Sequence, residues 1–296
     1  MAAFMSYNEA RRASKTPETW GEGEPEGVAA AEVANNADTA SALIPALTLG
    51  IPGTAVAAVM LGGLLIHGLQ PGPMLFRENP DCYLQTHLSE NKAEIELTRE
   101  LYPEARDYFD VYEKYGLLGE RSLFGHAIHL THRERDRMAE TGSVAVYCPT
   151  SNLFLGSGLY DEAGLKEAGV RRAIATDVGG GTNYSMLRTL DEGYKALQLR
   201  GQNIDPLRSF YWASLGNARA LTLEDRIGTL EPDTDADITV LNSRATDVMA
   251  LRMDTVESLQ EELFVLQTLG DDRAVVETYI AGRPAKQGPG QAFSAR

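Results

Sequence analysis

Histidine and carboxylate side chains follow short apolar segments in the second half of the chain. His87 and Glu90 are three residues apart, His126 follows the next apolar segment, and Asp177 is separated by one valine from three consecutive glycines. Two histidines and an aspartate at successive strand ends suit a borderline metal such as zinc. A glutamate beside such a metal is a natural proton shuttle, and an aspartate there could orient a water molecule and take its proton.

Each of these residues also has an ordinary structural explanation. A single His-x-x-Glu pair is a weak signal, because on a helix it is more often a solvated pair. His129 is expected to pack within its strand, His132 to lie on a helix surface, and Cys148 to be a small buried residue rather than a nucleophile. Asp177 could be a helix cap. The four features, occurring in one order at strand ends, favour an enzyme.

The elements that would position these residues alternate along the chain. Strands are expected at residues 82–88, 122–130, 143–147 and 172–176, and helices at 91–101, 107–115, 131–140, 185–199 and 205–215. Thr131 and Glu134 form the sequence pattern of a capping box, and Gly116 is well placed to end the second helix. This alternation predicts an α/β protein with parallel strands, whose active residues lie at the carboxyl ends of the strands.

The last part of the chain has a different pattern. Segments 237–241 and 275–280, the latter ending at a turn over 281–284, are rich in β-forming residues and flank a helix expected near 258–266. We interpret residues 233–296 as a small β domain beside the βα units.

The first part of the chain has neither the βα alternation of the middle segment nor the β-rich pattern of the last one. Residues 39–66 contain no charged side chain, and about 20 apolar residues suffice to span a bilayer. Their proline and glycine content is typical of the broken helices of membrane transporters. A buried core segment is the alternative, and the length of the uncharged stretch favours a membrane origin. We therefore expect membrane contact through residues 39–66.

Charge and cysteine content restrict partners and compartment. The formal net charge of −15 argues against nucleic acid, which requires positive charge for binding. Cys82 and Cys148, the two cysteines of the sequence, form no CxxC pair and suit a reducing cytoplasm.

From about residue 80 onward the sequence resembles the guanine deaminases of the amidohydrolase superfamily. The matching motifs are QTHLSEN (85–91), GH (125–126), CPTSN (148–152) and TDVGGG (176–181), followed by the closing segments LGNARAL (215–221), DRIGTLEP (225–232) and ADI (236–238). The resemblance implies about strands 5–8 of a (β/α)8 barrel with part of a small β-sandwich, one zinc ion, and hydrolysis of guanine to xanthine and ammonia. It also implies a homodimer.

The resemblance assigns roles to individual residues. His87 and Asp177 correspond to metal ligands, and Asp177 also to the base for the attacking water. Glu90 corresponds to the group that moves a proton to the purine ring and the leaving amine, and His126 to the group that helps hold the intermediate. His87, Glu90 and Asp177 would also contact the substrate.

The sequence departs from this family in its first third. A His-x-His pair, which supplies two further zinc ligands in the family, occurs nowhere in the chain, and the family's upstream Arg-Phe segment is also absent. Residues before about 81 instead resemble the large membrane subunit of tripartite tricarboxylate transporters, in ANNA (34–37), ALIPALTLGIPGT (42–54) and LIHGLQPGP (65–73). We therefore expect a fusion with parts at 1–79, 80–232 and 233–296 and a seam near 78–81.

These resemblances leave three functional hypotheses. The first is zinc-dependent guanine deamination by a cytoplasmic enzyme portion, and the second is a catalytically inactive fusion with a membrane-associated N-terminal segment. The third is an amidohydrolase acting on another aminated or chlorinated heterocycle. Four strands of an eight-stranded barrel would leave two open sheet edges and an uncovered interior.

Overall fold

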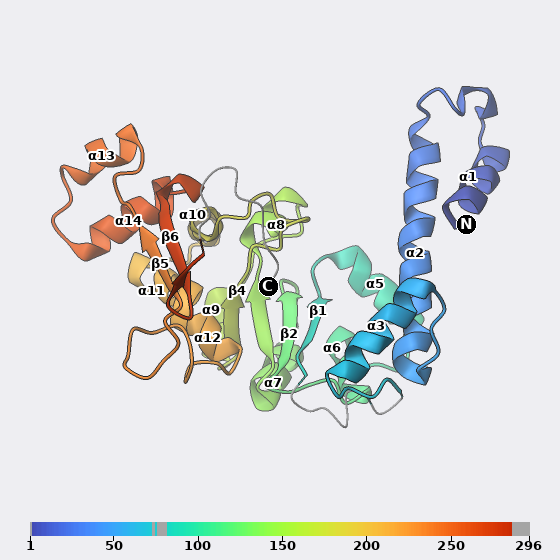
Figure 1. Ribbon diagram of the computed structural model, residues 1–296, viewed down its shortest axis with the longest axis horizontal. Helices are drawn as coiled ribbons and strands as arrows, with labels where there is room; N and C mark the ends of the chain where they lie inside the picture. Colours follow the sequence, from blue (N-terminus) through green and yellow to red (C-terminus); the bar gives the residue numbers. More distant parts are fainter. Residues whose placement is uncertain (1, 73–74, 76–81, 286–296) are drawn as a thin grey trace. The chain divides into compact units, whose positions relative to one another are not determined.

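The structure is a computed structural model that describes residues 2–72, 75 and 82–285 (Figure 1). The chain forms two units, Met1–Cys82 and Tyr83–Arg296. The seam expected near residues 78–81 lies outside the described residues, as does the tail beyond 285.

The first unit is helical. Its elements are α1 (Ala2–Ala13), η1 (Pro17–Thr19), α2 (Pro25–Leu49) and α3 (Ala55–Ile66). The buried Trp20 stacks edge-on against Tyr7, with ring centroids 5.0 Å apart. Gly27 allows this contact, because a Cβ atom at position 27 would lie only 2.9 Å from the Tyr7 ring.

The apolar stretch 39–66 is divided between two helices. Helix α2 ends at Leu49, Gly50 has a φ of +69°, and Thr54 caps α3 by accepting a hydrogen bond from the amide of Ala57. Across residues 2–72, 75 and 82–285, no helix is both long enough and apolar enough to cross a membrane. The prediction of a helical segment is confirmed. The predicted membrane span is not met by either helix: α2 has 25 residues but begins in a polar segment that carries Glu26, Glu32 and Asp38, and α3 has only 12 residues.

The second unit contains a four-stranded parallel sheet in the order β1-β2-β3-β4. The strands are β1 (Leu84–Leu88), β2 (Ser122–His126), β3 (Val144–Tyr147) and β4 (Arg171–Ile174). The connecting helices are α5 (Lys92–Leu101), α6 (Tyr108–Lys114), α7 (His132–Thr141), α8 (Pro149–Phe154) and α9 (Glu162–Glu167). The α/β class and the parallel strands predicted from the sequence are therefore confirmed, with α8 and α9 as additional helices.

Local capping explains several of these boundaries. Thr131 and Glu134 form the reciprocal capping box that starts α7, as the sequence predicts. Gly116 has a φ of +70° just beyond α6, a conformation that glycine adopts without strain. The strand expected at 122–130 is shorter than predicted, because His126 and Ala127 have positive φ and turn the chain out of the sheet.

Aromatic side chains fill the core between the sheet and its helices. Phe109 and Phe124 meet edge-to-face with centroids 5.1 Å apart, and Tyr147 stacks on Tyr160 at 4.5 Å. Trp212 closes this cluster. Burial of such large side chains is the main stabilising contribution to the unit.

After β4 the chain forms α10 (Met186–Leu199), α11 (Pro206–Tyr211), the π-helical segment η2 (Trp212–Gly216) and α12 (Asn217–Ala220). The single helix expected at 205–215 is therefore interrupted. The interruption brings Asn217 against β4, where its side-chain oxygen accepts from the Ile174 amide (3.0 Å) and its nitrogen donates to the Ile174 carbonyl (2.9 Å).

The C-terminal region forms a three-stranded antiparallel sheet in the order β5-β6-β7. The strands are β5 (Ile238–Leu241), β6 (Val275–Ile280) and β7 (Arg283–Pro284). Between β5 and β6 lie α13 (Asp247–Met253), α14 (Leu259–Leu269) and η3 (Asp272–Ala274). Helix α13 has no counterpart among the sequence expectations.

Candidate active site

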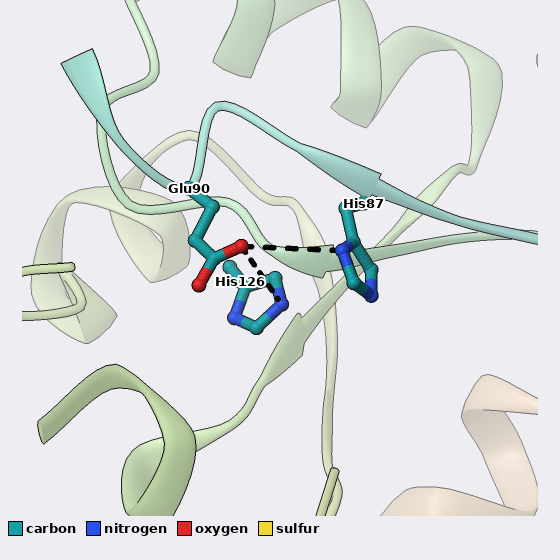
Figure 2. A group of neighbouring side chains, drawn as sticks. All are labelled: His87, Glu90 and His126. Atoms are coloured by element: carbon teal, nitrogen blue, oxygen red, sulfur yellow. Dashed lines mark ion pairs between the residues drawn. The ribbon is translucent and has the colours of Figure 1, made fainter. Parts of the chain in front are cut away.

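The carboxyl ends of β1 and β2 bring His87, Glu90 and His126 together. The strands pair in parallel with His87 opposite Gly125 and Leu88 opposite His126, so the two histidines lie at the same end of the sheet. Figure 2 shows the three side chains directed toward one another. Oε2 of Glu90 lies 3.9 Å from Nδ1 of His87 and 3.6 Å from Nε2 of His126.

Asp177 joins the group from the loop after β4, the strand at the opposite end of the sheet from β1. Its Oδ2 lies 3.7 Å from Nε2 of His126, so two carboxylate oxygens lie within 4 Å of this nitrogen. The structure thus places together all four residues that the sequence predicts for the site. Asp177 is not the N-cap of any helix in the described chain.

His126 is buried, with only 1% of its surface exposed. Its Nδ1 lies 2.8 Å from the side-chain oxygen of Asn152, which can only accept a hydrogen bond, so Nδ1 carries the proton. Its Nε2 then presents a lone pair, and no hydrogen-bond partner for that atom is present among the described residues. A buried nitrogen without a hydrogen bond is costly, which makes Nε2 a candidate to contact a ligand.

Hydrogen bonds hold the Glu90 side chain in place. The hydroxyl of Ser157 donates to its Oε1 at 2.8 Å, which leaves Oε2 for the two histidines. The Glu90 amide donates to Oε1 of Glu94 in the first turn of α5. The sequence pattern did not indicate the bond between Ser157 and Glu90 or the bond between Asn152 and His126. In each of these pairs the two residues are far apart in the sequence.

Several site residues have an uncommon backbone conformation. Ser89, His126, Ala127 and Asp177 have φ values of +50°, +68°, +48° and +48°. Such conformations cost free energy in residues other than glycine and cluster at functional sites. Here they turn the chain sharply at the strand ends, which directs the functional side chains toward the common center.

The glycines after Asp177 are required by close packing. A Cβ atom at Gly181 would lie 2.0 Å from the carbonyl oxygen of Thr176, and one at Gly180 would lie 2.8 Å from the Ser151 hydroxyl. The hydroxyl of Thr150 donates to the same Thr176 carbonyl at 3.0 Å, so the segment after β3 supports the loop that carries Asp177.

The second unit has two further histidines, His129 and His132, and a cysteine beside the site, Cys148. His129 lies in the loop beyond β2, not in the strand as predicted, and its Nε2 is 2.9 Å from the carbonyl oxygen of Ser157. His132 is exposed at the start of α7, as predicted. Burial raises the pKa of the Cys148 thiol to about 12, so the thiol stays protonated and is a poor nucleophile.

The donor set fits a divalent metal ion. Ligand atoms of His87, Glu90 and His126 lie within 4.8 Å of one another, and so do those of His126, Cys148 and Asp177. Imidazole nitrogen and carboxylate oxygen are ligands that zinc accepts, and the free lone pair of His126 Nε2 lies within the same group. These residues therefore suit a zinc site at the end of the sheet.

Comparison with known proteins agrees with this geometry. Residues 75–285 match the model of the "Amidohydrolase family", and residues 1–90 match that of the "Tripartite tricarboxylate transporter TctA family". The curated guanine deaminase of Escherichia coli is 46% identical over 209 residues, which cover 71% of this chain and 48% of that protein. The expected resemblances to guanine deaminases and to a transporter fragment are therefore both confirmed.

Solved structures give the same result. The structure of the E. coli guanine deaminase matches with a TM-score of 0.71 and 45% identity, covering 72% of this chain and 50% of that chain. A zinc-bound structure titled adenosine deaminase, from Xanthomonas campestris, matches with a TM-score of 0.61 and 28% identity, covering 71% and 46%. The chain spans about half the length of the curated relatives that it matches.

Proposed function

The chain belongs to the amidohydrolase family through residues 75–285, and on this premise we propose that its site serves the zinc-dependent hydrolytic deamination of guanine. In this reaction water adds to the ring carbon that bears the amino group, the carbon–nitrogen bond breaks, and xanthine and ammonia form. The E. coli protein that covers most of this chain's second unit is named guanine deaminase.

One observation carries the proposal. Oε2 of Glu90 lies within 4 Å of both His87 and His126, and Asp177 approaches the same His126 nitrogen. Two carboxylates close to the same buried imidazole allow one to receive a proton from water while the other delivers a proton to the leaving amine.

The residues divide this chemistry between them. His87 and Asp177 would hold a zinc ion, which when bound supplies a Lewis acid and lowers the pKa of water. Asp177 accepts a proton from the attacking water through Oδ2. Glu90, held by Ser157, would relay the protons that leave the attacking water to the purine ring and to the leaving amine. His126, fixed by Asn152, orients the oxygen that attacks the ring.

A second candidate is a chain that folds around this site without turnover. The observation that favors it is the absence of a His-x-His pair from the sequence. Catalytic zinc usually has three protein ligands, so His87 and Asp177 would need support from a neighboring residue such as His126 or Glu90.

Metal analysis and substrate comparison test the proposal. The full chain is purified with zinc, its metal content is measured, and guanine, adenine, cytosine and a chlorinated triazine are assayed side by side. We expect one zinc per chain and xanthine from guanine alone. One zinc per chain with no product from any substrate would reject deamination for this polypeptide and favor the inactive candidate. Product from adenine, cytosine or the triazine would instead support an amidohydrolase that acts on another aminated or chlorinated heterocycle.

We place this activity in the cytoplasm, because Cys82 and Cys148 are both free thiols. The homodimer implied by the family resemblance and membrane contact through residues 39–66 stay predictions.

A further inference from the structure

Cys148 lies directly after β3, between His126 at the end of β2 and Asp177 in the loop after β4. The three residues follow neighboring parallel strands, so their side chains meet at the same end of the sheet. A ligand atom of each, the sulfur of Cys148 included, lies within 4.8 Å of the other two. The buried thiol is a poor nucleophile, but its position is suited to a metal ligand.

Nε2 of His126 gives independent evidence for a ligand at this place. The residue is 1% exposed, its Nδ1 is bonded to Asn152, and its Nε2 has no hydrogen-bond partner among the described residues. The oxygens of Glu90 and Asp177 approach Nε2 to 3.6 Å and 3.7 Å, which is too long for hydrogen bonds. A nitrogen lone pair and two carboxylate oxygens repel one another unless a cation lies between them, so this arrangement favors a bound metal ion.

The spacing of these atoms suits a tetrahedral ion. Zinc binds nitrogen and oxygen at about 2.0–2.2 Å and sulfur at about 2.3 Å, so neighboring ligand atoms are roughly 3.5 Å apart. The distance of 3.7 Å between Nε2 of His126 and Oδ2 of Asp177 is close to that value. The sulfur of Cys148 lies within 4.8 Å of the ligand atoms of both residues, so a small movement of one side chain brings the three donors onto one ion.

The chemistry of the sulfur also suits zinc. Cys148 is 3% exposed, and its thiol donates a weak hydrogen bond to the Val146 carbonyl, with sulfur and oxygen 3.6 Å apart. When this sulfur binds a divalent ion, a sulfur–metal bond replaces the sulfur–hydrogen bond and the proton passes to solvent. The thiolate and the Asp177 carboxylate then neutralize the two positive charges, which lowers the cost of holding the ion in a buried place.

A second group of donors competes for the same nitrogen. His87, Glu90 and His126 also place ligand atoms within 4.8 Å of one another. Nε2 of His126 has a single lone pair and binds one ion, so only one of the two groups can hold a metal through it. The His87 side chain is 62% exposed, and the Glu90 carboxylate already accepts from Ser157 through Oε1. Thiolate is a ligand that selects zinc, so the group that contains Cys148 is favored.

We infer that Cys148 is a zinc ligand in this chain, binding through Sγ together with Nε2 of His126 and Oδ2 of Asp177. This inference rests on the proposed function for the identity of the metal, and it supplies the further ligands that Asp177 requires there. These residues reach three protein ligands, the usual number at catalytic zinc, without His87. Glu90 stays free to relay protons.

Cobalt substitution tests the inference without relying on turnover. Cobalt(II) binds the same kinds of site as zinc, and its bond to a thiolate gives an intense sulfur-to-cobalt charge-transfer band in the near ultraviolet. Cys82→Ser leaves Cys148 as the single cysteine of the full chain. We expect this variant to bind one cobalt ion per chain and to show the band, which zinc then abolishes by displacing cobalt.

Cys148→Ser is the matched variant, because it removes the thiol of Cys148 and keeps that of Cys82. We expect it to lack the band and to bind zinc at least about 10–100-fold more weakly in chelator competition, since losing even a group that orients a ligand has an effect of that size. Circular dichroism compares the folds of the two variants. If Cys148→Ser does not fold, the spectrum of Cys82→Ser decides the question, because its band can come from Cys148 alone.

The outcomes separate this inference from the proposed function. Cobalt bound without a sulfur band in Cys82→Ser, a band that persists in folded Cys148→Ser, equal zinc affinities of the two variants, or no metal bound at all would each overturn the inference. Xanthine formed by a zinc-loaded chain that lacks the cobalt band would overturn the Cys148 ligand and leave the proposed function standing. A sulfur band with one zinc per chain but no xanthine would uphold the Cys148 ligand and count against the proposed activity.

Discussion

Asn152 fixes the buried imidazole of His126 by accepting a hydrogen bond from Nδ1 at 2.8 Å. The two residues follow β2 and β3, and this bond determines that Nε2 is the nitrogen that presents its lone pair to Glu90 and Asp177. Interactions of this kind orient a functional histidine and tune its basicity.

Replacement of Asn152 tests this relationship. We expect Asn152→Ala to lower zinc affinity or xanthine formation by about 10–100-fold, the usual effect of losing a group that orients a metal-site histidine. Chelator competition measures the affinity, and circular dichroism checks the fold. The matched control is Asn203→Ala, which alters an exposed asparagine and should leave the affinity unchanged. Equal effects from both variants would show that Asn152 has no specific role.

Glu90 is expected to act on rate more than on structure. Glu90→Gln keeps the shape of the side chain but removes the carboxylate that moves protons, so xanthine formation should fall by about 10²–10⁴-fold. The initial rate at saturating guanine measures this effect. Glu96→Gln, on the exposed face of α5, is the control. A rate within twofold of the unmodified chain would exclude Glu90 as the proton carrier.

The loop that carries Asp177 should tolerate no side chain at position 181. In Gly181→Ala the new Cβ would lie 2.0 Å from the Thr176 carbonyl, so the loop must shift. We expect a loss of roughly 1–3 kcal/mol in the free energy of unfolding, the usual cost of overpacking, together with weaker zinc binding. Gly119→Ala is the control, because nothing lies within 4 Å of that Cβ. Urea titration compares the two, and equal stability would contradict the packing.

Thiol chemistry checks the environment of Cys148. Because burial raises the pKa of its thiol to about 12, Cys148 should not react with a thiol reagent at pH 8 until the chain is unfolded. The half-buried Cys82 should react in the native chain. In Cys82→Ser we therefore expect no reactive thiol before denaturant is added and one afterward. Rapid native labeling of this variant would rule out the buried environment.

Asp161 should make stability depend on pH. Burial raises the pKa of its carboxyl, but hydrogen bonds from Gln202 and the Gly164 amide outweigh that effect. With the positive charges of Arg200 and Arg135, they lower the pKa to about 2. Because the folded-state pKa is below the unfolded value of about 3.9, the stabilization is complete above that value and is lost as pH falls toward 2.

The expected consequence is that Asp161→Asn loses roughly 1 kcal/mol of stability at pH 7, with allowance for solvent screening, and less at pH 3. Asparagine can still cap α9, so the comparison isolates the charge. Unfolding midpoints of both proteins at pH 7 and pH 3 measure the effect. A difference that did not change between the two pH values would show that the ionized carboxyl is not responsible.

The sequence by itself determined the class of the second unit and the identity of its chemical residues. Apolar segments in alternation with capped helices predicted parallel βα units, and His87, Glu90, His126 and Asp177 followed from their positions at strand ends. These signals are local, because strand periodicity, caps and short motifs act within a few residues.

Tertiary structure alone decided how those residues are held and which side chains cover the edges of the parallel sheet. The hydroxyl of Ser157 reaches Glu90 across 67 residues, and Asn217 covers Ile174 across 43. The left-handed turn at His126, which shortens β2, also has no signal in the sequence. Such contacts and conformations depend on packing between distant segments. The contacts of Asn217 with β4 and of Tyr112 with β1 therefore became visible only in the folded chain.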